Sequence, residues 1–436
     1  MQIDFTAHTL DNGLDVIVHE DHGCPIVGVN VWYHVGSKNE VPGRTGFAHL
    51  FEHLMFEGSQ HYDRGYFHPL QEAGASVNGS TNADRTNYWE VVPKNALDLA
   101  LWMESDRMGY LLPALTAAKF DTQRDVVLNE RRQNYENRPY GLAGMALMGA
   151  LYPAAHPYHW LTIGAAADLR AASLEDVRAF FATYYRPGNA SLTVAGDVST
   201  EDVLAKVTDY FGSIDAGTPP PAVSAPPPPP LEREIRLLHE DRVELPRLYL
   251  AWHSPALFAE HDAELDLLAD VLSSGKTSRL YRALVYEQRI ATEVAASQNS
   301  REAGGYFQVA ATAAPGRTLT EVDRAIRHEI DALAAAGPVP AEMERVQAQA
   351  EAHFIHRLQT VGGFGGKSDQ LNAYNVLLGD PSFFARDLAR YRAVTAHGLM
   401  RTAATWLRPE RRVALSVVPE GRVALALSGS EAVAVA

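Results

Sequence analysis

The residues best suited to chemistry lie between positions 49 and 53, where two histidines flank a glutamate. His49 and His53 are four residues apart, and Glu52 directly precedes the second histidine. On a helix this spacing puts both imidazoles on one face, one turn apart, so that they can converge on a single ion. The carboxylate would lie near the same ion, placed to handle protons rather than to bind metal. The other positions are apolar and predict a buried helix: Phe47, Leu50 and Leu54. Polar side chains in a core need partners, and a metal ion would satisfy these.

This pattern predicts a catalytic zinc site that the helix alone does not complete. Such a site usually has three protein ligands and keeps a fourth position open. His49 and His53 would supply two of them. The third, an oxygen or nitrogen donor, must come from a distant element, and composition does not select it.

The segments around this helix predict a mixture of helices and strands. Alternating or β-branched runs favour strands at 14–18, 26–35 and 190–196, and a strand pair within 74–92. Apolar residues at helical spacing favour helices over 95–107, 116–137 and 174–185.

A proline-rich stretch divides the chain into two halves of similar plan. Residues 217–225 contain three prolines and are followed by five more at 226–230, and such runs form an extended linker. We therefore expect domains at 1–216 and 231–436, joined by a linker at 217–230. In the second half, the run Arg247–Trp252 matches the strand at Val29–Tyr33. A helix at 263–272 then stands where the histidine motif stood in the first half. The expected fold is α+β, with two homologous modules, each a mostly antiparallel sheet packed against helices, and a metal site in the first module only.

Composition excludes several other classes of protein. The chain has 436 residues, 46% of them hydrophobic, and a net charge of −15. The negative charge argues against nucleic acid or an anionic membrane as the main partner. The single cysteine, Cys24, excludes a disulfide framework and a thiolate metal cluster. No apolar run reaches the roughly 18 residues of a membrane span, and no signal peptide is visible. These features favour a cytoplasmic protein, or a periplasmic one if a signal peptide was removed.

The segment Gly46–Gly58 resembles the pitrilysin family of zinc metallopeptidases, the inverzincins, and in particular half-length bacterial members similar to the mitochondrial processing peptidase β subunit. The resemblance implies a processing-peptidase-like (LuxS-like) fold and one Zn²⁺ per chain. In this family the third ligand is a glutamate 77 residues beyond the second histidine. Counting from His53 leads to Glu130. The resemblance also implies that Glu52 is the general base that activates water for peptide hydrolysis.

The family binds peptides by adding them to an exposed sheet edge, where main-chain hydrogen bonds provide affinity with little sequence preference. The matching strand here is Ser76–Thr81, and the residues expected to bind substrate are Ser76, Val77, Asn78, Gly79 and Ser80. An ordinary edge strand without this role is the alternative. Several relatives carry a further glutamate seven residues before the third ligand. Here that position is Gln123, so its role near the site would be that of a neutral hydrogen-bonding group.

Relatives complete the active site with an arginine and a tyrosine seven residues apart, on a second half of the chain or a partner subunit. Val285 and Thr292 occupy those positions here, so the pair is missing. We therefore expect a homologous partner subunit that supplies it, in a heterodimer, although a homodimer remains possible. Nearby Arg279, Tyr281 or Arg282 could substitute for the pair.

Three functions are compatible with the resemblance. The first is a zinc endopeptidase that hydrolyses peptides or unfolded polypeptides. The second is a non-catalytic scaffold or binding subunit of the same fold, and the third is a processing peptidase that removes one specific segment. Because scaffold relatives typically lose ligands or the base, the combination of His49, Glu52, His53 and Glu130 favours an enzyme.

Overall fold

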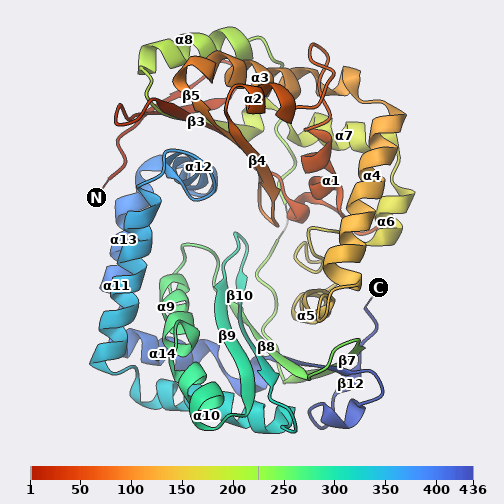
Figure 1. Ribbon diagram of the computed structural model, residues 1–436, viewed down its shortest axis with the longest axis vertical. Coiled ribbons are helices and arrows are strands. Elements are labelled where there is room, and N and C mark those ends of the chain that lie inside the picture. The colour runs from red at the N-terminus through yellow and green to blue at the C-terminus, as the bar shows by residue number, and fades with distance from the viewer. Residues whose placement is uncertain (1, 224, 436) are drawn as a thin grey trace. The chain divides into compact units, whose positions relative to one another are not determined.

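The computed structural model describes residues 2–223 and 225–435. The chain forms two compact units, shown with their elements in Figure 1. The first comprises Met1–Asn129, Thr162–Ser224 and His353–Arg386, and the second comprises Glu130–Leu161, Ala225–Ala352 and Asp387–Ala436. No helix in the described part of the chain is long and apolar enough to cross a membrane.

The first unit contains a sheet of six described strands in the order β1-β2-β6-β3-β5-β4. Neighbouring strands are antiparallel except β2 and β6, which are parallel. The central strands are buried on both faces, whereas β4 lies at an edge. The strand bounds are β1 (Thr6–Thr9), β2 (Asp15–Glu20), β3 (Ile26–Tyr33), β4 (Ser76–Thr81), β5 (Thr86–Pro93) and β6 (Ala190–Gly196).

Helices cover both faces of this sheet. Figure 1 shows α12 on the face opposite α3 and α8, and α12 packs against β2, β3 and β6. The motif helix α1 packs against β4 and α7. The helix bounds are α1 (Phe47–Leu54), α2 (Phe67–Glu72), α3 (Leu97–Ala114), α4 (Ala117–Arg131), α6 (Ala166–Ala171), α7 (Leu174–Tyr184), α8 (Thr200–Phe211) and α12 (Lys367–Leu378).

The second unit repeats this sheet plan in its five described strands from β7 to β9, whereas its outermost strand β12 is parallel to β7 and β1 is antiparallel to β2. Its described strands follow the order β12-β7-β11-β8-β10-β9, and its edge strand β9 packs against α9 as β4 packs against α1. The predicted α+β fold of two homologous modules is therefore confirmed. The strands are β7 (Ile235–Asp241), β8 (Arg247–Ser254), β9 (Ala291–Asn299), β10 (Gly305–Ala313), β11 (Val413–Pro419) and β12 (Glu431–Ala432). The helices are α5 (Ala143–Leu151), α9 (Asp262–Ser273), α10 (Leu319–Ala336) and α14 (Ala396–Trp406), while α11 (Pro340–Arg357) and α13 (Phe384–Ala393) each continue from one unit into the other.

The two halves of the chain exchange helices. Helix α5 comes from the first half but packs on β8 and β11, and α12 comes from the second half but packs on the first sheet. The linker predicted at 217–230 contains one boundary between the units, at 224/225. The domain bounds 1–216 and 231–436 stay a prediction. They divide the chain at a single linker and do not include the exchange of helices between the halves.

Buried and partly buried polar contacts fasten α12 to the first sheet. Asp369 Oδ1 accepts hydrogen bonds from Trp32 Nε1 at 2.8 Å and Asn87 Nδ2 at 3.1 Å. Asn372 Nδ2 donates to the carbonyl oxygen of Asn30 at 2.8 Å, and its Oδ1 accepts from Thr193 Oγ1 at 2.8 Å. Because buried polar groups are costly when unpaired, this set of partners specifies where the helix docks.

Candidate metal and substrate site

Helix α1 begins at a turn that two features fix. Gly46 precedes it with φ of 89°, and a Cβ at this position would lie 2.9 Å from the carbonyl oxygen of Ile163. The buried carboxylate of Glu40 accepts hydrogen bonds from the N–H groups of Gly46 (3.0 Å) and Ala48 (2.8 Å). A carboxylate there satisfies N–H groups that the helix leaves unpaired and complements the helix dipole. Glu40 thus sets the start of the motif helix, a role that sequence reasoning missed.

The two histidines of α1 face each other. Their Nε2 atoms lie 3.4 Å apart, and their ring planes are inclined by 86°. Two nitrogen ligands at about 2.0–2.1 Å from a tetrahedral ion would also lie about 3.4 Å apart, so the spacing fits a shared metal. Burial, followed by the charge of His53, lowers the pKa of His49 to about 4. His49 is therefore neutral near pH 7, which is the form that binds metal.

Glu130 approaches the histidines from α4. One ligand atom from each of His49, His53 and Glu130 lies within 4.8 Å of the other two. The division between the units falls inside α4, after Asn129, and this continuous helix carries Glu130 as its penultimate residue. Two imidazoles and one carboxylate are the donor set of many catalytic zinc sites. The residues present therefore fit the metal that the sequence predicts, and their role as ligands stays a prediction.

Glu52 is oriented by the edge strand. Its Oε2 accepts a hydrogen bond of 2.7 Å from Thr81 Oγ1, and Thr81 is the last residue of β4. The carboxylate is thus held between the histidine cluster of its own helix and the strand predicted to bind peptide. Sequence reasoning placed Thr81 in the strand expected to bind peptide but did not predict its contact with Glu52, because nothing in a strand sequence shows which helix its hydroxyl meets.

The predicted substrate residues lie along the open edge of β4. This strand pairs with β5 on one side only, and its exposure alternates, with Ser76 and Asn78 exposed and Gly79 buried. The residues of this set are Ser76, Val77, Asn78, Gly79 and Ser80. Their binding role stays a prediction.

Gly79 leaves space for two aromatic rings behind the strand. A Cβ on Gly79 would lie 3.1 Å from ring atoms of both Phe56 and Tyr88, so a larger side chain would have to displace them. The N–H group of Gly79 donates to Asn78 Oδ1 at 2.8 Å. A peptide that pairs with this N–H group must first displace the Asn78 side chain. The edge is therefore capped by its own side chain, which blunts its tendency to pair with unrelated strands.

Two models of one peptidase family match the chain in succession. The model described as "Insulinase (Peptidase family M16)" matches residues 15–155, and the model described as "Peptidase M16 inactive domain" matches residues 171–350. The chain belongs to peptidase family M16. The family resemblance expected from the sequence is thereby confirmed.

The sequences and structures similar to this chain align with more than half of its length. "Zinc protease PqqE" of Helicobacter pylori is 29% identical over 364 residues, covering 82% of this chain and 81% of that protein. A solved structure of a protease from Helicobacter pylori is 26% identical with a TM-score of 0.88, covering 96% of this chain and 100% of that one. The probable mitochondrial-processing peptidase subunit beta of Arabidopsis thaliana is 25% identical over 244 residues, covering 53% of this chain and 44% of that protein.

Among the described residues of the second M16 module, the helix that corresponds to α1 lacks the histidine motif. Helix α9 also begins after a left-handed residue, His261, as α1 begins after Gly46. Counted from these starts, Glu264, Leu267 and Leu268 replace the two histidines and the glutamate of α1. Both leucines are fully buried in the apolar core of this module. Only the first of these three positions, Glu264, keeps a polar side chain on α9.

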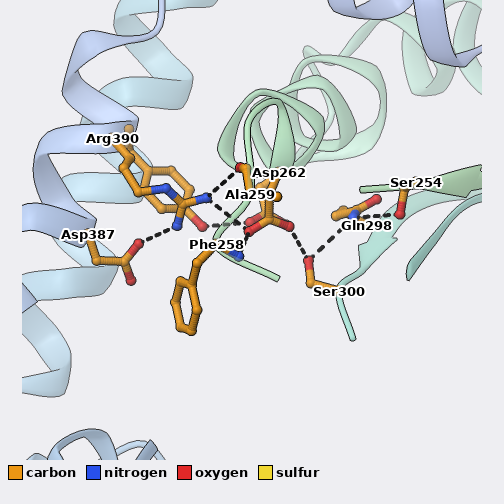
Figure 2. A network of polar contacts seen from close by, with 10 residues as sticks. Ser254, Phe258, Ala259, Asp262, Gln298, Ser300, Asp387 and Arg390 are labelled. Atoms are coloured by element: carbon orange, nitrogen blue, oxygen red, sulfur yellow. Dashed lines mark hydrogen bonds and ion pairs between the residues drawn. The ribbon is translucent and has the colours of Figure 1, made fainter. Parts of the chain in front are cut away.

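Helix α9 is anchored by a buried carboxylate of its own. Asp262 accepts hydrogen bonds from the Phe258 N–H group at 2.9 Å, Ser300 Oγ at 2.5 Å and Arg390 Nη2 at 3.0 Å. Figure 2 shows this network, in which Arg390 also contacts Asp387 at 2.7 Å. In both modules a buried acid therefore fixes the start of the helix that packs on the edge strand.

The positions expected to lack the arginine and tyrosine lie in this second module. Val285 is partly buried against the apolar core, and Thr292 Oγ1 donates to the carbonyl oxygen of Thr312 at 3.4 Å. The possible substitute Arg279 is bound by both carboxylate oxygens of Glu342, at 2.8 and 2.7 Å. Its guanidinium group is thus committed to an ion pair within the module.

Gln123 lies on α4, seven residues before Glu130. Its Nε2 donates to Glu57 Oε1, in the segment that directly follows α1. The contact links α4 to the end of the motif helix. The neutral hydrogen-bonding role predicted for Gln123 near the site stays a prediction.

We expect Thr81→Val to retain zinc but to lower kcat roughly 10–100-fold. The change keeps the shape of the side chain and removes the hydroxyl that orients Glu52, and hydrogen bonds to charged groups contribute about 1.5–3 kcal/mol. Steady-state kinetics on zinc-replete protein measure the loss. Thr81→Ser should restore most of the activity, since it keeps the hydroxyl. Equal loss in both variants would contradict an orienting role.

A buried charge cluster lies behind the aromatic rings near Gly79. Arg107, from α3, donates to both carboxylate oxygens of Glu104 and approaches Glu90 Oε1 at 3.4 Å. Its guanidinium group lies 4.1 Å from the ring centre of Tyr66 and 4.2 Å from that of Tyr88. All three charged side chains are almost completely buried. Burial, and then repulsion from Glu104, raises the pKa of Glu90 well above its ordinary value of 4.5, while Arg107 opposes the shift.

We expect Glu90→Gln to stabilise the protein increasingly as pH rises from 5 to 8. Below the unfolded pKa of about 4.5, Glu90 is protonated in both states and costs nothing. Above it the unfolded state releases the proton while the folded state keeps it, so the wild-type protein loses stability up to the raised folded pKa. Glutamine does not titrate and avoids this loss. Thermal unfolding midpoints of both proteins across this range measure the difference, and a difference that is independent of pH would contradict the assignment.

Proposed function

We propose that this chain is the zinc-binding catalytic subunit of an M16 endopeptidase that hydrolyses peptides or unfolded polypeptides. The observation that carries this proposal is the cluster of His49, His53 and Glu130 beside Glu52. A scaffold subunit would have no need to keep four such groups together, because each costs stability when buried without a function.

In this proposal His49, His53 and Glu130 hold one Zn²⁺ per chain. When bound, zinc supplies a Lewis acid that polarises a peptide carbonyl and increases the acidity of water. The nitrogen and oxygen donors of this set suit zinc better than the all-oxygen sites that calcium or magnesium prefer.

Glu52 moves the proton that hydrolysis requires. Its carboxylate accepts a proton from the attacking water as the new C–O bond forms, and donates it to the amine nitrogen as the C–N bond breaks. The hydrogen bond from Thr81 keeps the carboxylate turned toward the edge strand, where the peptide would lie. The proton is thus transferred without any further acid from this chain.

The peptide binds as an additional strand along β4, at the residues 76–80. Main-chain pairing there accepts many sequences, which suits a substrate class defined by being extended rather than by one motif. On binding, the Gly79 N–H group would give up its hydrogen bond to Asn78 and donate to a carbonyl oxygen of the peptide instead. Binding therefore depends on an extended substrate backbone. A segment that is already paired or packed within a folded protein cannot add to this edge.

A homologous partner subunit contributes the remaining groups, an arginine and a tyrosine. Support comes from Val285 and Thr292 at the corresponding positions and from the ion pair that occupies Arg279. A heterodimer follows most directly, because a second copy of this chain would also lack the pair. A homodimer would have to use other side chains.

Metal content and peptide cleavage by the full-length chain test the proposal. We expect about one zinc per chain by elemental analysis, and hydrolysis of a quenched fluorescent peptide once the chain is co-expressed with an M16 homologue that carries the arginine and tyrosine. His49→Ala provides the zinc-free control. Zinc uptake without cleavage in any pairing would favour the scaffold function. Full activity of the chain alone would eliminate the need for a partner, and cleavage at a single site in a peptide mixture would indicate a processing peptidase.

A further inference from the structure

We propose that Phe364 and Trp89 form an apolar subsite that receives a large apolar side chain of a peptide bound along β4. This inference rests on the proposed function and adds a side-chain preference to it. The subsite would lie on the face of the first sheet that α12 covers, away from the face on which α1 carries the histidines.

Trp89 lies next to the open edge of the sheet. It sits on β5 directly opposite Asn78 of β4 and opposite Asn30 of β3. Residues that face each other across a sheet share a face. The side chain of Asn30 bonds to Asp369 and Asn372 of α12, so Trp89 and Asn78 lie on the face covered by α12. The indole Nε1 of Trp89 is buried, which leaves only carbon on its exposed surface.

Phe364 stands over Trp89 and remains exposed. Its ring centre lies 5.3 Å from that of Trp89 at an interplanar angle of 85°, an edge-to-face arrangement. Its exposed fraction is 49%, which is high for a phenylalanine in a packed unit. Both residues belong to the first unit. The pair thus presents exposed aromatic surface, and Trp89 sits on the strand next to β4.

The loop that carries Phe364 is firmly attached to the sheet. Asp369 Oδ2 accepts a hydrogen bond of 2.7 Å from the Gly365 N–H group, while its Oδ1 binds side chains of β3 and β5. The N–H group of Lys367 donates to the carbonyl oxygen of Thr360 at 2.9 Å and closes the loop. An exposed aromatic ring on a fixed loop loses little conformational freedom when it binds, so its contacts translate efficiently into affinity.

A peptide strand added to β4 would direct alternate side chains to this subsite. Side chains opposite Val77 and Gly79 would point to the α1 face, and the side chain opposite Asn78 would point to the α12 face. Strands are spaced by about 4.8 Å, so the added strand would lie about 10 Å from β5. A phenylalanine or leucine side chain spans part of that distance, and we propose that it meets the aromatic surface of Trp89 and Phe364. Asn78 is small enough to let the two meet.

The test uses the zinc-loaded, full-length Glu52→Gln chain, so that peptides bind without being consumed. A labelled peptide that the wild-type enzyme cleaves sets the register, and each position is changed in turn to alanine or phenylalanine. Fluorescence anisotropy then gives the Kd. We expect phenylalanine to bind at least 10-fold tighter than alanine at one position, and this ratio to fall to within about twofold when Phe364→Ala is added. The adjacent positions should keep their ratios.

Controls separate this inference from the proposed function and from loss of folding. Val423→Ala removes another exposed apolar side chain, in the second unit, and should leave every ratio unchanged. Phe364→Leu should keep most of the preference. An unchanged preference in Phe364→Ala would overturn the subsite while peptide binding and cleavage stand. Weaker association with the partner subunit but unchanged peptide ratios would also overturn it, by assigning the ring to an interface. A zinc-loaded chain that neither binds nor cleaves any peptide would overturn both proposals.

Discussion

Glu52→Gln is expected to lower kcat by about 10²–10⁴-fold while the chain keeps its zinc. The amide has the size of the carboxylate and can still accept the hydrogen bond from Thr81. It cannot accept a proton at neutral pH, so the transfer from water to the leaving amine is lost. His49, His53 and Glu130 are unchanged, and metal affinity should therefore remain close to that of the wild-type chain. Steady-state kinetics combined with elemental analysis of the same samples measure both quantities.

The matched control is Glu72→Gln, the same chemical change at an exposed residue of α2. It should keep wild-type turnover and zinc content. Turnover of a zinc-replete Glu52→Gln sample within about tenfold of wild type would exclude Glu52 as the general base. Loss of zinc in that sample would instead show that the carboxylate supports the metal site.

Arg107→Met is expected to destabilise the first unit by about 3–5 kcal/mol near pH 7. Methionine fills most of the space between the rings of Tyr66 and Tyr88 but leaves Glu104 without its ion-pair partner in the core. An uncompensated buried carboxylate must either remain charged at high cost or take up a proton. The thermal unfolding midpoint should fall by roughly 10 °C, and the loss should shrink as pH falls toward 5 and protonation of the carboxylates becomes easier.

Lys206→Met is the control for removal of a positive charge. Lys206 forms an ion pair of 2.8 Å with Asp98 at the surface of the same unit, where such pairs contribute roughly 0–1 kcal/mol. Its midpoint should therefore change by no more than a few degrees. If Arg107→Met were equally mild, the ion pair between Arg107 and Glu104 would not contribute to the stability of the first unit.

The local chemistry of the site was predictable from the sequence. Helical spacing alone placed His49 and His53 on one face, and the apolar residues between them predicted burial. The family resemblance added Glu130, which the structure brings close to both histidines. Strand patterns and the repeated order of elements likewise predicted two similar modules, because alternation and helical periodicity are local properties of the chain.

The groups that orient the site were not predictable in this way. Glu40 caps α1 from a preceding turn, and Thr81 reaches Glu52 from the end of a strand. Each is an ordinary polar residue in its own segment, and its function depends on a partner whose position is set by how helix and strand pack. The periodicity of apolar residues in a sequence does not show which polar side chains will meet.

By itself the sequence determined which residues could bind a metal and move a proton, since side-chain type and helical spacing define that chemistry. Only the tertiary structure decided that α5 and α12 are exchanged between the halves of the chain, and that Phe364, far along the chain, stands over Trp89 beside β4. The sequence of a helix shows which of its faces is apolar, but it does not show which of the two sheets that face packs against. The choice is made by buried hydrogen bonds such as those of Asp369 and Asn372, which are satisfied on one sheet only when the whole chain has folded.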